Sequence, residues 1–389
     1  MRVAYICTDP GVPVFGRKGS SIHVQAIIRA LLRRGMDVEL FASRFDGERP
    51  SDCGKVRLHA LSRPPKGDLA AREQMALAAN HDLRVALEAE GPFDLVYERY
   101  ALWSFAGMEY AQAINVPGML EVNAPLIEEQ AAHRGLADRA GAEAVAGRVF
   151  GAATALLAVS DGVATYLETH PAARGRVHVL ANGVDPDRFP PDLVPELPRE
   201  PGSFTIGFVG TLKPWHGLDT LLAAFDTLHE CDKGMRLLIV GDGPERETLE
   251  VEASTRGLAD AVIFMGAVDP ARIPGLLASM DVATAPYPAL DHFYFSPLKV
   301  YEYMAAGVCV VASRVGQLAE LIRDDSNGVL YSPGDVEALV VSLRQLRADP
   351  ERHERLGAAG RATVIGAHTW DSVAARMLEL AGVDVEWSS

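Results

Sequence analysis

The chain alternates short runs of β-branched and aromatic residues with longer segments of helical periodicity from end to end. This alternation is typical of parallel β-sheets built from βαβ units. In the first half it predicts strands at residues 3–7, 38–42, 93–98, 118–122, 155–159 and 177–180. A helix is expected from Ile22 to Arg34, because Gly35 follows in the position where glycine commonly ends a helix.

Five prolines among acidic residues interrupt the pattern at 189–201, and we interpret 191–202 as an interdomain linker. The alternation then restarts, with strands expected at 204–209, 235–240, 262–265, 282–285, 308–312 and 328–331 and a helical tail from Asp335. The prediction is an α/β protein with two Rossmann-like, doubly wound domains, 1–190 and 203–370. Residues 371–389 are expected to form a C-terminal helix that can pack back on the first domain. Two such domains would place a ligand cleft at the carboxyl ends of their strands.

Composition narrows the class of protein. With 389 residues, 48% hydrophobic and 23% charged, the chain is an ordinary globular one, and its net charge of −15 argues against a nucleic-acid partner. No apolar run approaches the roughly 20 residues of a membrane-spanning helix. The four cysteines lack disulfide or zinc spacing, so we expect a cytoplasmic protein without a metal.

Residues 1–72 nevertheless carry more Lys and Arg than Asp and Glu. Arg29, Arg33 and Arg34 gather on the first predicted helix. We favour a solvated helix face. The alternative is a peripheral contact with anionic lipid on the cytoplasmic face of a membrane.

The strongest candidate site lies in residues 295–307. Ser296 suits a helix N-cap and Pro297 the first helical position, so the N–H groups of Leu298 and Lys299 would form an anion site at the helix start. The Lys299 ammonium adds charge there. Glu302, one turn on, can accept hydrogen bonds from a vicinal diol such as ribose. The pattern suits a nucleoside diphosphate, although a plain helix start with a solvated Glu302 explains it equally well.

Two further turns follow predicted strands. Residues 209–218 place Thr211, Lys213 and His216 where a Rossmann unit has its phosphate loop, with Lys213 and His216 as cationic candidates. Gly241 and Gly243 resemble half of a dinucleotide fingerprint, but Arg246 replaces its third glycine, so NAD binding is not expected. Ordinary turn glycines are the alternative in both places.

The first crossover and two strand ends of the first half complete the set. Gly19 and Ser20 precede the first helix, where glycine lets the backbone approach a ligand and Ser20 or Ser21 can cap. The sequence supports two interpretations of His23 equally well, a buried packing residue and a catalytic residue. Polar side chains at the ends of two strands can orient sugar hydroxyls or form a structural ion-pair cluster: Glu98, Arg99, Glu121 and Asn123.

Taken together, these motifs resemble glycosyltransferase family 4, whose members have the GT-B fold and retain anomeric configuration. The resemblance runs from residue 1 to about 370. It rests on Gly-Asp-Gly-Pro at 241–244, Asn-Gly-Val-Asp at 182–185, Val-Gly-Thr…His-Gly at 209–217 and Glu-Tyr-Met-Ala-Ala-Gly at 302–307.

The resemblance implies a cytoplasmic hexosyltransferase of carbohydrate biosynthesis that uses a UDP- or GDP-sugar as co-substrate and no cofactor or metal. Glu302 would hold the donor ribose and the 296–299 helix start the diphosphate, with Lys213 and Lys299 as cations. Gly266 to Val268 would lie against the base, and Gly19 and Ser20 would approach the phosphate or sugar. The acceptor would be a glycan, glycolipid or small metabolite.

The chain departs from the family pattern in three respects. The family's first Glu falls on Tyr294, its Arg and Lys before the second-domain helix fall on Thr211 and His216, and its cleft histidine falls on Asn123. Lys213 can compensate for the second change. The alternatives are another GT-B enzyme, such as a sugar-nucleotide epimerase or phosphorylase, and a two-domain binding protein without chemistry.

Overall fold

The computed structural model describes residues 1–63, 67–198, 200–290, 293–294 and 296–383. Residue 199 of the predicted linker, Phe295 of the candidate motif and residues 384–389 of the predicted terminal helix lie outside this set. The chain divides into two compact units. Unit 1 comprises Met1–Asn182, Tyr294–Ser296 and Trp370–Ser389, and unit 2 comprises Gly183–Phe293 and Pro297–Thr369.

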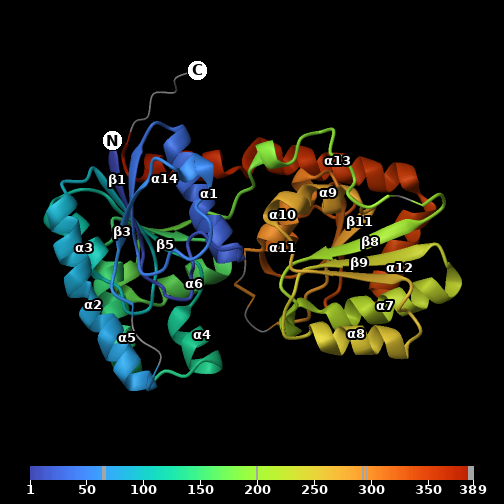
Figure 1. Ribbon diagram of the computed structural model, residues 1–389, viewed down its shortest axis with the longest axis horizontal. Coiled ribbons are helices and arrows are strands. Elements are labelled where there is room, and N and C mark those ends of the chain that lie inside the picture. Colours follow the sequence, from blue (N-terminus) through green and yellow to red (C-terminus); the bar gives the residue numbers. More distant parts are fainter. Residues whose placement is uncertain (64–66, 199, 291–292, 295, 384–389) are drawn as a thin grey trace. The chain divides into compact units, whose positions relative to one another are not determined.

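Unit 1 is a seven-stranded parallel sheet in the order β3-β2-β1-β4-β5-β6-β7. Its strands are β1 (Arg2–Cys7), β2 (Asp37–Ala42), β3 (Arg57–Ala60), β4 (Leu95–Arg99), β5 (Gly118–Val122), β6 (Ala155–Ala158) and β7 (Val177–Val179). Its helices are α1 (Gly19–Arg33), α2 (Leu69–Glu90), α3 (Ala106–Ala113), α4 (Leu126–His133), α5 (Arg139–Ala152), α6 (Asp161–Glu168) and α14 (Trp370–Leu380). Figure 1 shows α2, α3 and α5 together on one face of this sheet, while α1 and α14 lie against each other.

Unit 2 is a six-stranded parallel sheet in the order β10-β9-β8-β11-β12-β13. Its strands are β8 (Phe204–Val209), β9 (Met235–Val240), β10 (Val262–Gly266), β11 (Val282–Ala285), β12 (Cys309–Ser313) and β13 (Val329–Tyr331). Its helices are α7 (Leu218–Cys231), α8 (Arg246–Thr255), α9 (Ile273–Ala278), α10 (Leu298–Ala305), α11 (Gly316–Leu321), α12 (Val336–Ala348) and α13 (Pro350–Ala367).

The core of unit 2 explains why its strands are recognisable in the sequence. Phe204, Ile206 and Phe208 of β8 pack into the cluster formed with α7 and α12, whereas Val209 joins the cluster formed with α9 and α10 on the other face. In Figure 1, α7, α8 and α12 accordingly lie on one side of the strands and α9, α10 and α11 on the other. Because both faces are covered, each strand is a nearly continuous apolar run.

The predicted fold class, two doubly wound parallel α/β domains, is confirmed. One strand was missed: β3 reads Arg-Leu-His-Ala, lies at a sheet edge and is largely exposed, so it lacks the apolar run that marks the others. The first helix begins at Gly19 rather than Ile22. The expectation that Ser20 or Ser21 caps it is wrong, because both are inside the helix and Ser21 Oγ donates to the carbonyl of Pro13.

The two arginines of α1 and the C-cap residue Arg34 are bonded within unit 1. Arg29 Nε lies 2.6 Å from Asp52 Oδ2, Arg33 Nε 3.1 Å from Asp371 Oδ1, and Arg34 Nη2 donates to the Asp371 carbonyl at 2.7 Å. They tie α1 to its neighbours. Within the described residues, no helix is long and apolar enough to cross a membrane.

The loops after β8, β9 and β10 depend on glycine. Gly241 has φ +136°, and a Cβ there would collide with the Gly210 carbonyl oxygen. We predict that Gly241→Ala lowers the free energy of unfolding of unit 2 by about 1–3 kcal/mol or more. The matched control is Gly366→Ala in α13, where a Cβ meets no atom within 4 Å. That change should raise stability by about 0.4–1 kcal/mol. Urea unfolding of both variants measures this, and equal stabilities would contradict it.

Candidate functional site

In each sheet the strand order reverses beside the first strand, between β1 and β4 in unit 1 and between β8 and β11 in unit 2. Ligands of doubly wound sheets bind outside the carboxyl ends of the strands at such a reversal. In unit 2 the residues there are Gly210 and Thr211 after β8, and Pro286 and Tyr287 after β11.

Three glycine turns are stacked at this edge of unit 2. The Gly210 N–H donates to the Val240 carbonyl at 2.9 Å, and the Gly241 N–H donates to the Gly266 carbonyl at 2.9 Å. A Cβ at Gly243 would strike the backbone of Leu212. The predicted donor-binding glycines Gly241, Gly243 and Gly266 thus have a structural reason to be glycine. Their close packing brings three strand ends together at one edge.

Lys299 of α10 reaches this reversal point. Its Nζ lies 4.1 Å from the centroid of the Phe208 ring and 5.4 Å from that of Tyr287. It is also only 2.9 Å from where a Cβ on Gly210 would stand, so glycine there makes room for the ammonium. The Nζ is buried and has no hydrogen-bond partner among the described residues. Burial lowers the pKa of Lys299 to about 7.

The start of α10 differs in detail from the prediction. The helix begins at Leu298 with Pro297 in the cap position and no side-chain cap. The prediction that Ser296 caps it is wrong, because Ser296 Oγ accepts the Asn182 N–H at 3.3 Å and the Ser296 carbonyl accepts from Asn182 Nδ2 at 2.8 Å. The first N–H groups of a helix, here those of Leu298 and Lys299, have no partner within the helix and can bind an anion.

The loop after β8 contributes less charge than its residues predict. Burial and the Lys299 ammonium lower the pKa of His216 to about 3, so its ring is neutral at pH 7. The expectation that His216 supplies positive charge is therefore wrong. Its Nδ1 lies 2.5 Å from the carbonyl oxygen of Thr211 and closes the turn. Lys213 lies beside the ring of Trp215, with its Nζ 5.4 Å from the centroid.

Glu302 is paired with a residue that the sequence did not single out. Arg188 Nη1 donates to Glu302 Oε1 at 2.8 Å, and Arg188 Nη2 donates to the Pro270 carbonyl at 3.0 Å. Burial raises the pKa of Glu302, and Arg188 opposes this shift. The sequence feature that could have pointed to Arg188 is the Asp185-Pro186 turn just before it. In this turn the Asp185 side chain accepts the Asp187 N–H, which positions Arg188. Arg188 thereby links Glu302 to Pro270, in the loop that follows Gly266 and Val268. Val268 itself packs against the apolar core of unit 2.

Unit 1 contains the predicted polar cluster, centred on Glu121 of β5. Its Oε2 lies 2.9 Å from His23 Nε2 of α1 and accepts the Tyr97 hydroxyl, while its Oε1 accepts Arg99 Nη1 at 2.7 Å and Asn123 Nδ2. Burial alone would raise the pKa of Glu121, but His23, Arg99 and Tyr97 together lower it strongly. This is the ion-pair cluster that the sequence left as one of two alternatives.

Two other candidates lie apart from Glu121. Glu98 points to the opposite face of β4, where Ser104 Oγ donates to it beneath Gly107, and burial raises its pKa to about 7. The Tyr294 hydroxyl lies 3.4 Å from Glu129 Oε2, and the Tyr294 carbonyl accepts from Ser160 Oγ. Gly19 and Ser20 form the first turn of α1, where Gly19 is exposed and Ser20 half-buried.

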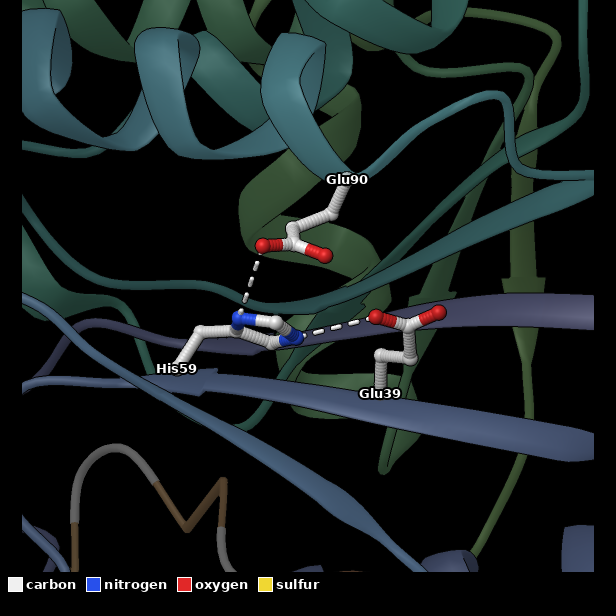
Figure 2. Close-up of side chains that lie close together, drawn as sticks. All are labelled: Glu39, His59 and Glu90. Atoms are coloured by element: carbon white, nitrogen blue, oxygen red, sulfur yellow. Dashed lines mark hydrogen bonds and ion pairs between the residues drawn. The ribbon is translucent and has the colours of Figure 1, made fainter.

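A further group of metal-ligating types lies at the other end of the unit 1 sheet. Figure 2 shows His59 between Glu39 and Glu90, with Nε2 2.9 Å from Glu39 Oε2 and Nδ1 3.8 Å from Glu90 Oε1. Arg2 and Arg57 both donate to Glu39 Oε1 at 2.5 Å. Two guanidinium groups on one carboxylate oxygen repel a cation, so this donor set suits a structural ion-pair network.

Comparison with known proteins agrees with the two-unit division. The family model described as "Glycosyltransferase Family 4" matches residues 17–188, and the one described as "Glycosyl transferases group 1" matches residues 192–363. A D-inositol 3-phosphate glycosyltransferase of Xylanimonas cellulosilytica is 30% identical over 389 residues, which cover 93% of this chain and 91% of the relative. A GDP-mannose-dependent alpha-(1-6)-phosphatidylinositol monomannoside mannosyltransferase of Mycobacterium tuberculosis is 30% identical over 59% of this chain and 64% of its own.

Solved structures share the fold. Sucrose-phosphate synthase of Thermosynechococcus elongatus superposes with a TM-score of 0.78 at 23% identity, covering 97% of this chain and 98% of that one. The Anabaena protein HepE, solved in complex with UDP and glucose, gives a TM-score of 0.74 at 19% identity over 98% and 99% of the two chains. The architecture is that of the GT-B fold.

The buried ammonium makes a testable contribution to stability. Because the pKa of Lys299 is about 7 in the folded chain and near 10.4 when unfolded, the unfolded state binds more protons between these values. The free energy of unfolding should therefore rise with pH across this window, by an amount on the order of a few kcal/mol. Below pH 7 the folded chain holds the charged ammonium, so the cost of burying it is then fully present. Lys299→Met should remove this rise.

The control is Lys213→Met, which removes a half-exposed lysine of the same site and should keep the rise. Denaturant unfolding of the three proteins from pH 6 to 10 measures the effect. A Lys299→Met protein with the same pH slope as the unchanged chain would contradict the assignment.

Proposed function

Because the chain belongs to glycosyltransferase family 4, we propose that this glycosyltransferase moves a hexosyl unit from a UDP- or GDP-sugar to an acceptor hydroxyl with retention of configuration. The observation that carries the proposal is the partnerless ammonium of Lys299 at the strand reversal of unit 2. Burying an ammonium without a counter-ion is unfavourable, and a bound diphosphate would supply the missing charge.

The donor's diphosphate lies, in this proposal, between Lys299 and the first N–H groups of α10. Positive groups fixed before the reaction stabilise the negative charge that develops on the departing diphosphate. This electrostatic role needs no metal ion. Lys213 adds a second cation from the loop after β8, while Thr211 and His216 contribute neutral polar contacts.

The nucleoside is held by Glu302 and the loop beyond β10. The pair with Arg188 uses Glu302 Oε1, so Oε2 can accept hydrogen bonds from the ribose hydroxyls. Gly266 and Val268 would lie against the base. Arg188 joins these two parts through its bond to Pro270, which keeps the carboxylate at a fixed distance from the base loop.

The names of similar proteins support both the proposed nucleotide-sugar donor and the proposed acceptor. The mannosyltransferase relative is named for GDP-mannose, and HepE was solved with UDP and glucose, so both nucleotides remain candidates. Both named relatives act on molecules that contain inositol and phosphate. In unit 1, Asn123 and Arg99 around Glu121, together with Tyr294, are the proposed sugar-side groups. Glu98 is not among them, because it is buried on the opposite face of β4 beneath Gly107. Gly19 and Ser20 would approach the donor.

Glu302→Gln tests the donor site. The substitution keeps size and removes the charge that accepts the ribose hydroxyls, so we expect the Kd for UDP or GDP to rise about tenfold or more. Turnover should fall in parallel. Calorimetric titration of both nucleotides into the purified chain measures this, and it also identifies the preferred base.

The matched control is Glu320→Gln, a like substitution in α11 of unit 2. Its nucleotide affinity should equal that of the unchanged protein. Normal affinity and turnover in Glu302→Gln would contradict the assignment. Incubation with donor alone separates a transferase from an epimerase, because an epimerase converts the sugar nucleotide without an acceptor.

A further inference from the structure

A cavity of ≈ 740 Å³ opens at the carboxyl ends of β1 to β4 in unit 1. Its wall includes Thr8 after β1, Ser43 after β2, Leu61 after β3 and Ala101 after β4. The strand order of unit 1 reverses between β1 and β4, so the cavity occupies the ligand-binding position of this sheet. Its volume is in the usual range of small-molecule sites. Neither Glu121 nor any residue bonded to it lines this cavity.

The lining carries an excess of positive charge. Three arginines contribute to it, Arg63, Arg72 and Arg134, against two carboxylates, Asp9 and Glu73. Both oxygens of Glu73 are used within the protein, because they accept the N–H groups of Ala137 and Asp138 at 2.9 Å.

The other charged side chains of the lining differ in how far they are already bonded within the protein. Asp9 Oδ1 accepts the Gly11 N–H at 2.7 Å. Arg134 makes one exposed ion pair, 3.2 Å from Glu129, which is worth little in water. Arg72 is exposed on the first turn of α2.

Other wall groups define the rest of the ligand. Thr8 and Ser43 bring polar groups to the wall, where Ser43 Oγ donates to the Thr8 carbonyl at 2.9 Å. Trp103, Leu102 and Leu126 are half-buried and give an apolar surface on which a saturated ring or chain can rest. The wall therefore combines anion-binding groups, other polar groups and an apolar surface.

We propose that this cavity binds the acceptor through a phosphate ester, with Arg72 and Arg134 holding the phosphate. Guanidinium groups bind phosphate oxygens through paired, charge-assisted hydrogen bonds, which a neutral sugar cannot provide. The inference rests on the proposed transferase function and names the chemical class of its acceptor. A small phosphorylated polyol and a phospholipid headgroup share this chemistry.

The experiment uses the full chain saturated with UDP or GDP, whichever binds, so that the donor site is filled. Inorganic phosphate, D-inositol 3-phosphate and inositol are titrated separately by calorimetry or NMR. We expect D-inositol 3-phosphate and inorganic phosphate to bind and inositol to bind at least tenfold more weakly. Vesicles of phosphatidylcholine with and without phosphatidylinositol form a separate arm, in which selective binding would assign the phosphate to a lipid headgroup.

Variants connect the binding to the cavity. Arg72→Ala and Arg134→Ala should each weaken phosphate-ester binding about tenfold or more, and Arg72→Lys should lose less because it keeps the charge. The control is Arg84→Ala, which removes an arginine from the same helix α2, outside the cavity lining. Nucleotide affinity should be unchanged in all four.

The outcomes separate the two proposals. Failure of every nucleotide to bind counts against the donor site. If nucleotide binds but phosphate esters bind no better than inositol, or bind Arg72→Ala and Arg134→Ala as well as Arg84→Ala, the acceptor inference is overturned while the donor site stands.

Discussion

The unpaired ammonium of Lys299 is the feature around which the second unit is organised. A charge removed from water costs several kcal/mol unless an opposite charge accompanies it, and here the neighbours are two aromatic rings and a glycine. The chain accommodates the group by lowering its pKa to about 7. Such a site is incomplete by itself and favours any anion that fits.

The surroundings hold that ammonium in place. The hydroxyl of Tyr303, from the same helix, accepts the Val209 N–H at 2.7 Å and donates to the Val209 carbonyl at 3.1 Å, which fixes the end of β8. Gly210 follows directly and leaves space for the Nζ. Helix α10 thus supplies the cation, the anchor for the loop, the N–H groups at its own start and, through Glu302, the carboxylate.

Much of this was accessible from the sequence, and the failures have physical reasons. Most strands of the described residues are apolar runs that patterning reveals, whereas β3 is an exposed edge strand in which Arg57 and His59 alternate with apolar residues. The 296–307 motif was found because capping chemistry is local. Its cap was nevertheless misassigned, because Asn182 recruits the Ser296 side chain from more than a hundred residues away.

Properties that depend on distant partners could not be read from the chain. Arg188 meets Glu302 across 114 positions, and the neutral state of His216 follows from burial and from Lys299. The unit 1 cavity is assembled from the ends of four strands and from two helices, which lie far apart in the sequence. Residue types were visible in the sequence, but their shared surroundings were not.

The most direct test of the account follows the Nζ of Lys299 itself. Lysine-selective NMR, with Lys299→Met to assign the signal, gives its pKa with and without the preferred nucleotide. The account predicts a pKa near 7 in the free protein and a marked rise when the diphosphate binds. A Lys299 signal that titrates near 10.4 in the free protein, or that does not respond to nucleotide, would contradict it.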